Sequence, residues 1–224
     1  MKSSLRAEVV VEFLGTALLV AAVIGSGIMG ERLANGNVAI ALLANSLATG
    51  AALVALILTF GPISGGHFNP LVTLGMAWAN DFGWRRLPAY CGAQFVGGFA
   101  GAATAHWMFG LPLFSVSLHA RHGVGQIGSE FIATFGLLCV VWGCTRFRPS
   151  ATAYAVGAYI TAAYWFTGST SFANPAVTLA RTASNTFAGI RPADAPAFLA
   201  AQLLGALVAT CLFRWMAAQW IVEK

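Results

Sequence analysis

Long apolar stretches separated by short polar segments dominate this chain. A helix needs about 20 mostly apolar residues to cross the hydrocarbon layer of a membrane. Six stretches have this character, at residues 9–29, 38–60, 87–109, 127–145, 151–167 and 197–219. Glycines are frequent within them, as expected where membrane helices pack closely. The pattern predicts an all-α membrane protein with six transmembrane helices.

The composition agrees with this interpretation and excludes other classes of protein. Of the 224 residues, 58% are apolar and only 8% are charged, whereas about a quarter of the residues in a soluble domain are charged. Disordered chains are poor in apolar residues, so disorder is excluded as well. The net charge of +5 reflects scarce acidic residues, and the basic residues are scattered. We therefore expect the lipid bilayer, and no nucleic acid, as a partner.

The four cysteines lie in or beside apolar stretches and form no motif with histidine. We therefore expect no disulfide framework, metal site or cofactor. No nucleophile and base occur in an arrangement typical of catalysis, so the sequence predicts no enzyme and no catalytic residues.

The distribution of Lys and Arg predicts the orientation in the membrane. With six spans both termini lie on one side, and that side carries eight basic residues: Lys2, Arg6, Arg85, Arg86, Arg146, Arg148, Arg214 and Lys224. The other side carries four: Arg32, Arg121, Arg181 and Arg191. Because basic residues accumulate on the cytoplasmic side, both termini are predicted to be cytoplasmic.

The chain contains an internal repeat. Residues 12–16 (EFLGT) resemble residues 130–134 (EFIAT), and residues 69–74 (NPLVTL) resemble residues 174–179 (NPAVTL). A third pair, at residues 88–97 and 196–205, shares the pattern PA(Y/F)…Q…G. Each half contains three spans, so the halves must have opposite orientations. We predict a single domain, residues 1–224, built from inverted repeats at about residues 1–110 and 127–224.

The two Asn-Pro segments carry the candidate chemistry. Each follows a turn rich in Gly and Ser and precedes an apolar stretch too short to cross a membrane. Asn is a good N-cap and Pro suits the first position of a helix, so a half-helix should begin at each motif. Two such helices would meet near the midplane, where their positive dipole ends repel cations. The arrangement predicts a pore for small uncharged solutes.

These motifs resemble the major intrinsic protein family, the aquaporins and aquaglyceroporins, over essentially the whole chain. The resemblance implies six spans with two re-entrant half-helices, a passive pore in each subunit of a homotetramer, and, for this chain, a bacterial inner membrane. It implies that Glu12 and Glu130 anchor the loops. It also implies a pore midpoint formed by Asn69, Pro70, Leu71, Asn174, Pro175 and Ala176 and lining carbonyls from Gly65, Gly66, His67, Phe68, Thr170 and Phe172.

The sequence departs from the family pattern at two positions. Leu71 stands where the family has Ala, and Val177 stands where most members have the arginine of the outer constriction. Spacing from the two asparagines gives four filter positions: Thr49, Ala162, Ser171 and Val177. Because this set has no aromatic, imidazole or guanidinium group, it predicts a wide filter. Arg181, one helical turn beyond Val177, is expected either to line the outer vestibule or to extend to the membrane interface.

A filter without arginine is similar to that of bacterial aquaglyceroporins from arsenic-resistance operons. The similarity implies permeation by glycerol, urea, undissociated arsenous acid and related trivalent or methylated metalloid species, with water possible. Two alternatives remain open at this point: a water-selective aquaporin, and an ion-coupled secondary transporter, because such transporters also have inverted repeats with broken helices.

Overall fold

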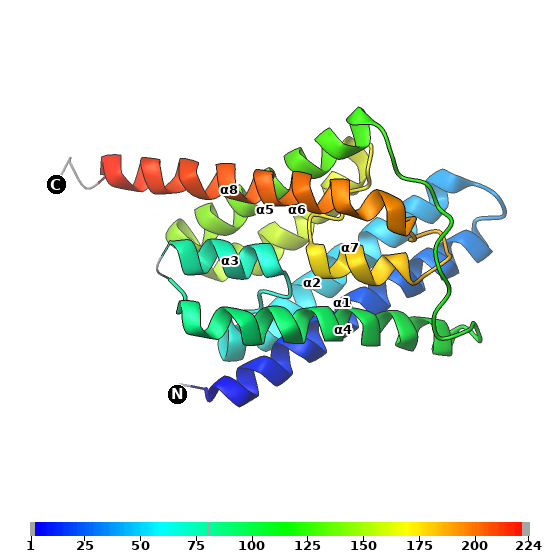
Figure 1. Cartoon of the computed structure of the whole chain (residues 1–224), viewed down its shortest axis with the longest axis horizontal. Coiled ribbons are helices and arrows are strands. Elements are labelled where there is room, and N and C mark those ends of the chain that lie inside the picture. The colour runs from blue at the N-terminus through cyan, green and yellow to red at the C-terminus, as the bar shows by residue number, and fades with distance from the viewer. Residues whose placement is uncertain (1–2, 80, 221–224) are drawn as a thin grey trace.

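The computed structural model describes residues 3–79 and 81–220. The described part contains α-helices and three short 3-10 turns, and no strand. In chain order the α-helices are α1 (Leu5–Leu33), α2 (Val38–Ser64), α3 (Pro70–Trp78), α4 (Leu87–Met108), α5 (Val124–Phe147), α6 (Thr152–Phe166), α7 (Pro175–Thr182) and α8 (Ala195–Trp220). Figure 1 shows the long helices as a bundle around the two short ones, α3 and α7.

Local sequence signals explain where several helices begin and end. The side-chain oxygen of Asn37 accepts hydrogen bonds from the N–H groups of Ala39 and Ile40 and so caps α2. This helix ends at Gly65, whose φ of 94° lies in the left-handed region that favours glycine. The half-helices α3 and α7 each begin with proline after an asparagine cap, as the Asn-Pro motifs predict.

The bundle consists of two similar sets of helices. In one half α1 packs against α2 and α4, and in the other α5 packs against α6 and α8. A methyl group on Gly97 of α4 would overlap the Phe13 carbonyl of α1, and one on Gly205 of α8 would overlap the Phe131 carbonyl of α5. Glycines at equivalent places in the repeat thus permit close helix contact in each half.

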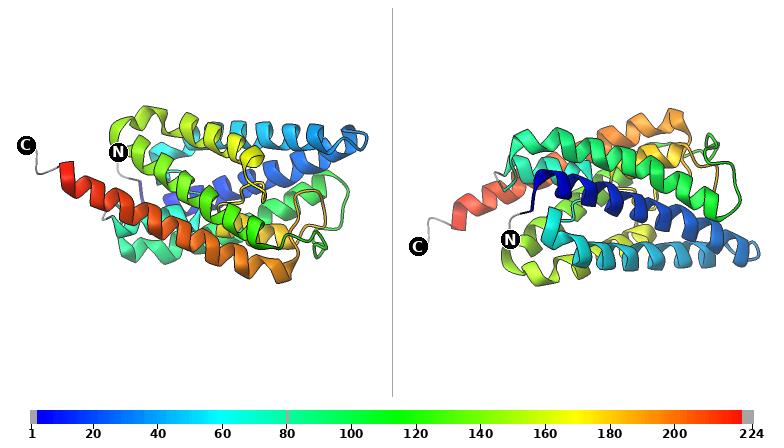
Figure 2. Two further views of the ribbon diagram at one scale, coloured as in Figure 1. Left: turned by 90° about the horizontal axis from the view of Figure 1, so that it is seen from above. Right: turned by 90° about the horizontal axis from the view of Figure 1, so that it is seen from below.

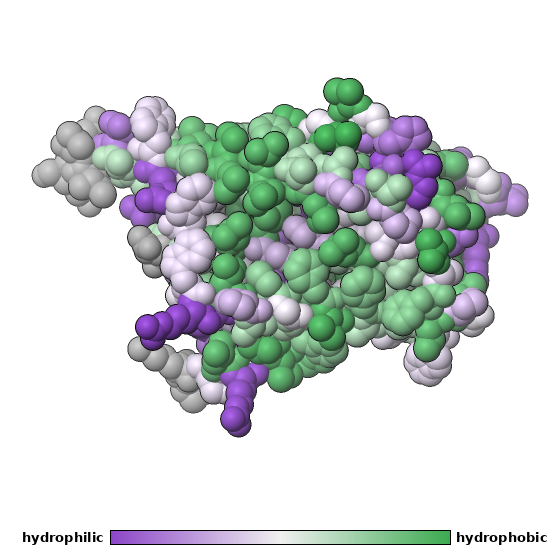
Figure 3. All heavy atoms as spheres, viewed as in Figure 1, coloured by the Kyte–Doolittle hydropathy of each residue, from purple (hydrophilic) through white to green (hydrophobic). Residues whose placement is uncertain are grey.

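The two ends of the bundle are distinct. We call the end that holds the start of α1 and the end of α8 the inner end, and the opposite end the outer end (Figures 1 and 2). The segment 109–123, which joins α4 to α5, crosses the outer end. On the face shown in Figure 3, apolar side chains cover the middle and hydrophilic residues gather toward both ends. This banding is what a bilayer requires.

All six stretches predicted to span a membrane are helical in the structure. Among the described residues, four segments are both long and apolar enough to cross a membrane: Leu5–Leu33, Val38–Ser64, Val124–Phe147 and Pro192–Gln219. The other two stretches form α4 and α6, and α6 has only 15 residues. Lys2 and Lys224, which entered the charge count, lie outside the described residues.

Candidate solute pore

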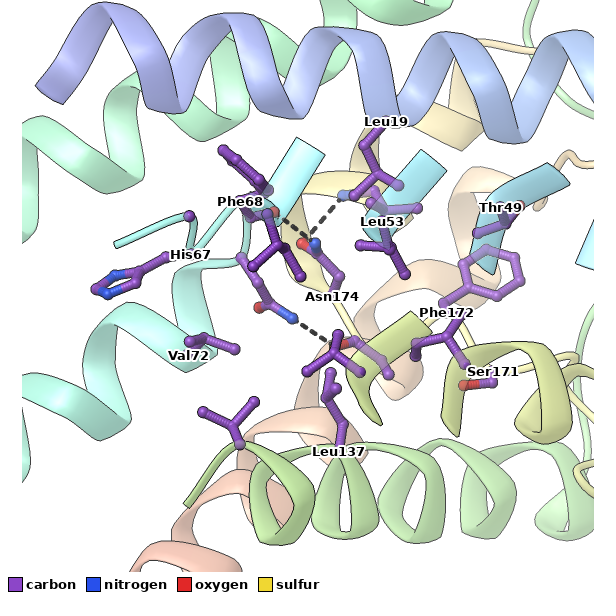
Figure 4. Close-up of a pocket in the computed structure, with 18 of the residues that line it drawn as sticks. Leu19, Thr49, Leu53, His67, Phe68, Val72, Leu137, Ser171, Phe172 and Asn174 are labelled. Atoms are coloured by element: carbon purple, nitrogen blue, oxygen red, sulfur yellow. Dashed lines mark hydrogen bonds between the residues drawn. The ribbon is translucent and has the colours of Figure 1, made fainter. Parts of the chain in front are cut away.

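The two half-helices meet at their N-termini through their capping asparagines. The side-chain oxygen of Asn69 accepts a hydrogen bond from the N–H of Leu71, and that of Asn174 accepts from Ala176 and Val177. The side-chain amide nitrogen of each asparagine instead donates to the loop that precedes the other half-helix. Asn69 Nδ2 donates to the Ala173 carbonyl at 2.8 Å, and Asn174 Nδ2 donates to the Phe68 carbonyl at 2.7 Å (Figure 4).

The residue before each asparagine has an unusual backbone conformation that makes this exchange possible. Phe68 has φ of 46° and Ala173 has φ of 48°, both in the left-handed region that non-glycine residues rarely adopt. Both residues provide the carbonyl that the opposite asparagine binds. Backbone strain of this kind persists where surrounding contacts determine the conformation, and it is frequent at functional sites.

Two buried carboxylates fix the loops that carry these strained residues. Glu12 accepts hydrogen bonds from the Ser64 hydroxyl, the N–H groups of His67 and Phe68, and the Gln94 amide. Glu130 has the same set of donors in the other half: the Ser169 hydroxyl, the N–H groups of Phe172 and Ala173, and the Gln202 amide. Each carboxylate therefore has four protein donors and is entirely buried. The arrangement suits a structural anchor for each loop.

A cavity of about 100 Å³ passes between the loops beside both asparagines. Its lining combines carbonyl-bearing loop residues with apolar side chains of the long helices (Figure 4). The apolar side includes Leu19, Val23, Leu53, Ile57, Val72, Leu137, Val141, Val156 and Ile160. Among the described residues, no Asp or Glu lines it. A path with acceptors along one side and hydrocarbon along the other suits small molecules that carry both hydroxyl and apolar surface.

At the inner end the cavity continues into a wider vestibule of about 810 Å³. Gly65, His67, Met76 and Thr145 line both spaces and so mark the junction between them. The His67 ring is held there, because its Nδ1 lies 3.1 Å from the Thr73 hydroxyl. Asp81, Arg146 and Arg214 make the vestibule polar.

The structure brings together three of the four predicted filter residues. Thr49, Ser171 and Val177 line the cavity near Arg181. The Ser171 hydroxyl is buried and has no hydrogen-bond partner among residues 3–79 and 81–220, so it is available to a solute.

The prediction for Ala162 is wrong. Ala162 is exposed on the outside of α6 and does not line the cavity, whereas Ile160 and Tyr164 of the same helix do. Successive helical residues are rotated by about 100°, so Ile160 and Tyr164 share a face and Ala162 lies on the other. The repeat of apolar residues through Val156, Ile160 and Tyr164 is the signal that would have identified this face.

The remaining predicted residues divide into lining and supporting groups. Gly65, Gly66, His67, Phe68, Phe172, Asn69 and Asn174 line the cavity. Pro70, Leu71, Pro175 and Ala176 are buried without lining it, and Leu71 packs into the apolar core. Thr170 does not line the cavity either, and its hydroxyl is 3.4 Å from Arg121.

Arg181 lies at the outer end of the cavity. It is only 1% exposed, so it does not extend to the membrane interface. Its Nε donates to the Ala188 carbonyl, and its guanidinium carbon lies 3.3 Å from the centre of the Phe172 ring. The four filter positions contain no arginine, but Arg181 contributes a guanidinium to the same cavity one helical turn further out. Sequence reasoning did not predict that the aromatic side chains of Tyr164 and Phe172 would line the cavity.

The chain matches the family described as "Major intrinsic protein" over residues 1–152 and 146–223. It is 53% identical to Aquaglyceroporin AqpS of Rhizobium meliloti (strain 1021) over 92% of this chain and 88% of that protein. It is 35% identical to Aquaporin NIP1-3 of Oryza sativa subsp. japonica over 77% of this chain, which spans 62% of that longer relative.

Among solved structures, the aquaglyceroporin from Plasmodium falciparum has a similar fold. The TM-score is 0.71 at 25% sequence identity, and the match covers 94% of each chain. Together, the paired asparagine loops, the cavity between them and these similarities show that the chain belongs to the major intrinsic protein family, as an aquaglyceroporin-type channel for small uncharged solutes and not an enzyme.

Proposed function

We propose that this channel conducts glycerol, urea, undissociated arsenous acid and related trivalent or methylated metalloid species, with water able to pass as well. The observation that carries the proposal is the side chain at the predicted filter position. Val177 lines the cavity, and the arginine lies one turn further out, where the Ala188 carbonyl holds its Nε. The filter position itself is therefore free of the bulky charged group that narrows a water-selective pore.

The chemistry of the lining supports polyol-like solutes. Arsenous acid and glycerol are neutral at pH 7 and carry several hydroxyl groups. The Ser171 hydroxyl and the loop carbonyls beside Phe68 offer acceptors, and the Arg181 Nη groups, which have no hydrogen bond to the described residues, offer donors. Val177, Ile160 and Leu53 provide apolar surface opposite these groups.

Coupled secondary transport is not favoured by the contacts of the two buried carboxylates. Coupling to protons or sodium requires an ion site that faces the substrate. Glu12 and Glu130 each accept four hydrogen bonds from loop and helix donors, and neither lines the cavity. Their environment supports a role as loop anchors.

We further propose six transmembrane spans in an inverted repeat, α1, α2, α4 with α5, α6, α8, and a homotetramer with one pore in each subunit. The matched donor sets of Glu12 and Glu130 support the repeat. The inner end would face the cytoplasm of a bacterial inner membrane, because most of the interfacial basic residues lie there.

Stopped-flow light scattering on proteoliposomes tests the proposed solutes. We expect glycerol, urea and arsenous acid to enter faster than into protein-free vesicles of the same lipid and size. If only water entered faster, the channel would be water-selective and the proposal would be wrong. If uptake depended on a proton or sodium gradient, the result would instead support an ion-coupled secondary transporter.

A further inference from the structure

Backbone hydrogen bonds fix the segment 109–123 to the C-terminal end of α7 and to the stretch that follows this helix. The N–H groups of Ser115 and Ser117 donate to the carbonyls of Ala183 and Thr182, each at 2.9 Å. In return, the N–H of Arg191 donates to the His119 carbonyl at 2.8 Å. This connection is thus part of the structure at the outer end of the pore.

Arg121 extends from this segment into the protein. It is 7% exposed, and its guanidinium donates only to neutral acceptors on the two stretches that flank α7. Nε lies 2.8 Å from the Gly189 carbonyl, Nη1 lies 3.1 Å from the Ser169 carbonyl, and Nη2 lies 3.4 Å from the Phe187 carbonyl. Arg121 thereby joins the stretch before Asn174 to the stretch after α7.

Two guanidinium groups consequently lie around one aromatic ring at the outer end of the cavity. The guanidinium carbon of Arg121 is 5.0 Å from the centre of the Phe172 ring, and that of Arg181 is 3.3 Å away. Each guanidinium is attracted to the aromatic ring by a cation–π interaction. Phe172 itself lines the cavity next to Ser171.

Within the described part of the chain, neither guanidinium has an ion-pair partner. Two carboxylates are nearby, and both are engaged by other groups. Asp194 accepts from Arg191 and from the backbone N–H of Arg121, while Glu130 accepts its four hydrogen bonds from the loop and Gln202. Burial lowers the pKa of Arg121 to about 10, so its side chain remains charged at neutral pH. Two guanidinium groups and one carboxylate without a cationic partner, Glu130, therefore lie together here and leave a net positive charge at the outer end of the pore.

We propose that Arg121 is a specificity-determining residue of the channel, which together with Arg181 forms a positive barrier that excludes protons and other cations. The inference rests on the proposed function, a pore for neutral solutes with Val177 at the constriction. Arg121 does not line the cavity; it acts through its field and by positioning Phe172. The barrier lies outward of the constriction, so cation exclusion does not require a bulky charge where large neutral solutes pass.

The test measures proton flux and glycerol flux in the same proteoliposomes. Proton entry is followed with a trapped pH-sensitive dye under a potassium diffusion potential, and glycerol entry by light scattering. For Arg121→Gln we expect the ratio of proton to glycerol flux to rise roughly tenfold, because one of two nearby charges is lost. Arg121→Lys retains the charge and should restore a low ratio. If Gln and Lys raised the ratio equally, the role would be structural only and the proposal would be wrong.

A second pair of variants keeps Arg121 in place and changes only the charge beside it. The Thr170 hydroxyl lies 3.4 Å from Arg121 Nη1, and Thr170 has φ of 65°, a conformation that Asp and Asn tolerate better than most residues. Thr170→Asp places a carboxylate against Arg121, whereas Thr170→Asn has nearly the same shape without charge. We expect the proton-to-glycerol ratio to be roughly tenfold higher for the Asp variant than for the Asn variant.

The possible failures are distinguishable. Equal ratios for the Asp and Asn variants, or a wild-type channel that conducts protons freely, would overturn the barrier while leaving neutral-solute conduction intact. A wild-type channel that conducts no glycerol, urea or arsenous acid would overturn the proposed function itself.

Discussion

At the scale of single residues, Val177 is the position at which we expect one side chain to decide which solutes pass. It lines the cavity one turn before Arg181 and close to Ser171. For Val177→Arg we expect glycerol, urea and arsenous acid flux to fall roughly tenfold, because a guanidinium fills space and retains water at the constriction. Water flux should fall less. Val177→Ile, which adds one methylene without charge, is the control. If the Arg variant conducted every solute as fast as the wild type does, Val177 would not be at the constriction.

The buried carboxylates lead to a second residue-scale prediction, about stability. Glu130→Gln turns one acceptor oxygen into a donor that faces the N–H or hydroxyl donors of Ser169, Phe172 and Ala173. Leaving buried donors without an acceptor costs about 1–3 kcal/mol each, so we expect a clear fall in the unfolding temperature in detergent. Glu12→Gln is the matched variant in the other half and should behave alike. An unchanged unfolding temperature would contradict the anchoring role.

The sequence predicted these residues unevenly, for a physical reason. Asn69, Asn174, Glu12 and Glu130 lie in short motifs that appear twice, and their roles depend on neighbours within each motif and its repeat. Ala162 was placed by spacing along the chain, and spacing does not specify which face of a helix points inward. Arg121 was missed because its role depends on the folding of a long connection onto the opposite loop, and no local pattern in the sequence encodes such a contact.

At the scale of elements, contact between helices depends on small residues. A methyl group at Gly97 would overlap the Phe13 carbonyl of α1, while one at Gly92 of the same helix would meet no atom within 4 Å. Gly97→Ala should therefore destabilise the protein by about 1–3 kcal/mol through overpacking. Gly92→Ala should not, since alanine also has the higher helix propensity. Unfolding temperatures of both variants in the same detergent test this expectation, and equal values would contradict it.

The stability that the packing of segment 109–123 contributes should depend on pH through Asp194. The hydrogen bond from Arg191, together with the one from the Arg121 backbone, holds the pKa of Asp194 below its usual value. Because the folded-state pKa is lowered, the contribution to stability is complete above the ordinary Asp value of about 3.9 and disappears as the pH falls through the lowered one. Asp194→Asn should thus lower the unfolding temperature at pH 7, and the difference from the wild type should shrink steadily as the pH falls below the ordinary Asp value. A difference that does not shrink in acid would exclude the carboxylate as its cause.

At the scale of the whole molecule, the hydropathy pattern predicted every long helix, but not how each crosses the membrane. α6 has 15 residues because the chain leaves the helix at Thr167 to enter the outer re-entrant loop. The pattern counts apolar residues along the chain and therefore extends through the end of such a helix. The inverted repeat was more informative, because an odd number of helices in each half relates the two re-entrant loops to opposite faces.

The structure also sharpens the prediction of orientation. Two of the four basic residues assigned to the outer side, Arg121 and Arg181, are buried around Phe172 and do not face the membrane interface. The excess of basic residues at the inner interface is thus larger than the count of Lys and Arg along the chain indicates. The inner end should therefore face the cytoplasm. In a variant without the native cysteines, Val116→Cys on the outer segment should react with a membrane-impermeant maleimide in intact cells. Ser150→Cys, exposed at the inner end between α5 and α6, should react only after permeabilisation. Labelling in the opposite order would reverse the topology and place the wide vestibule outside the cell.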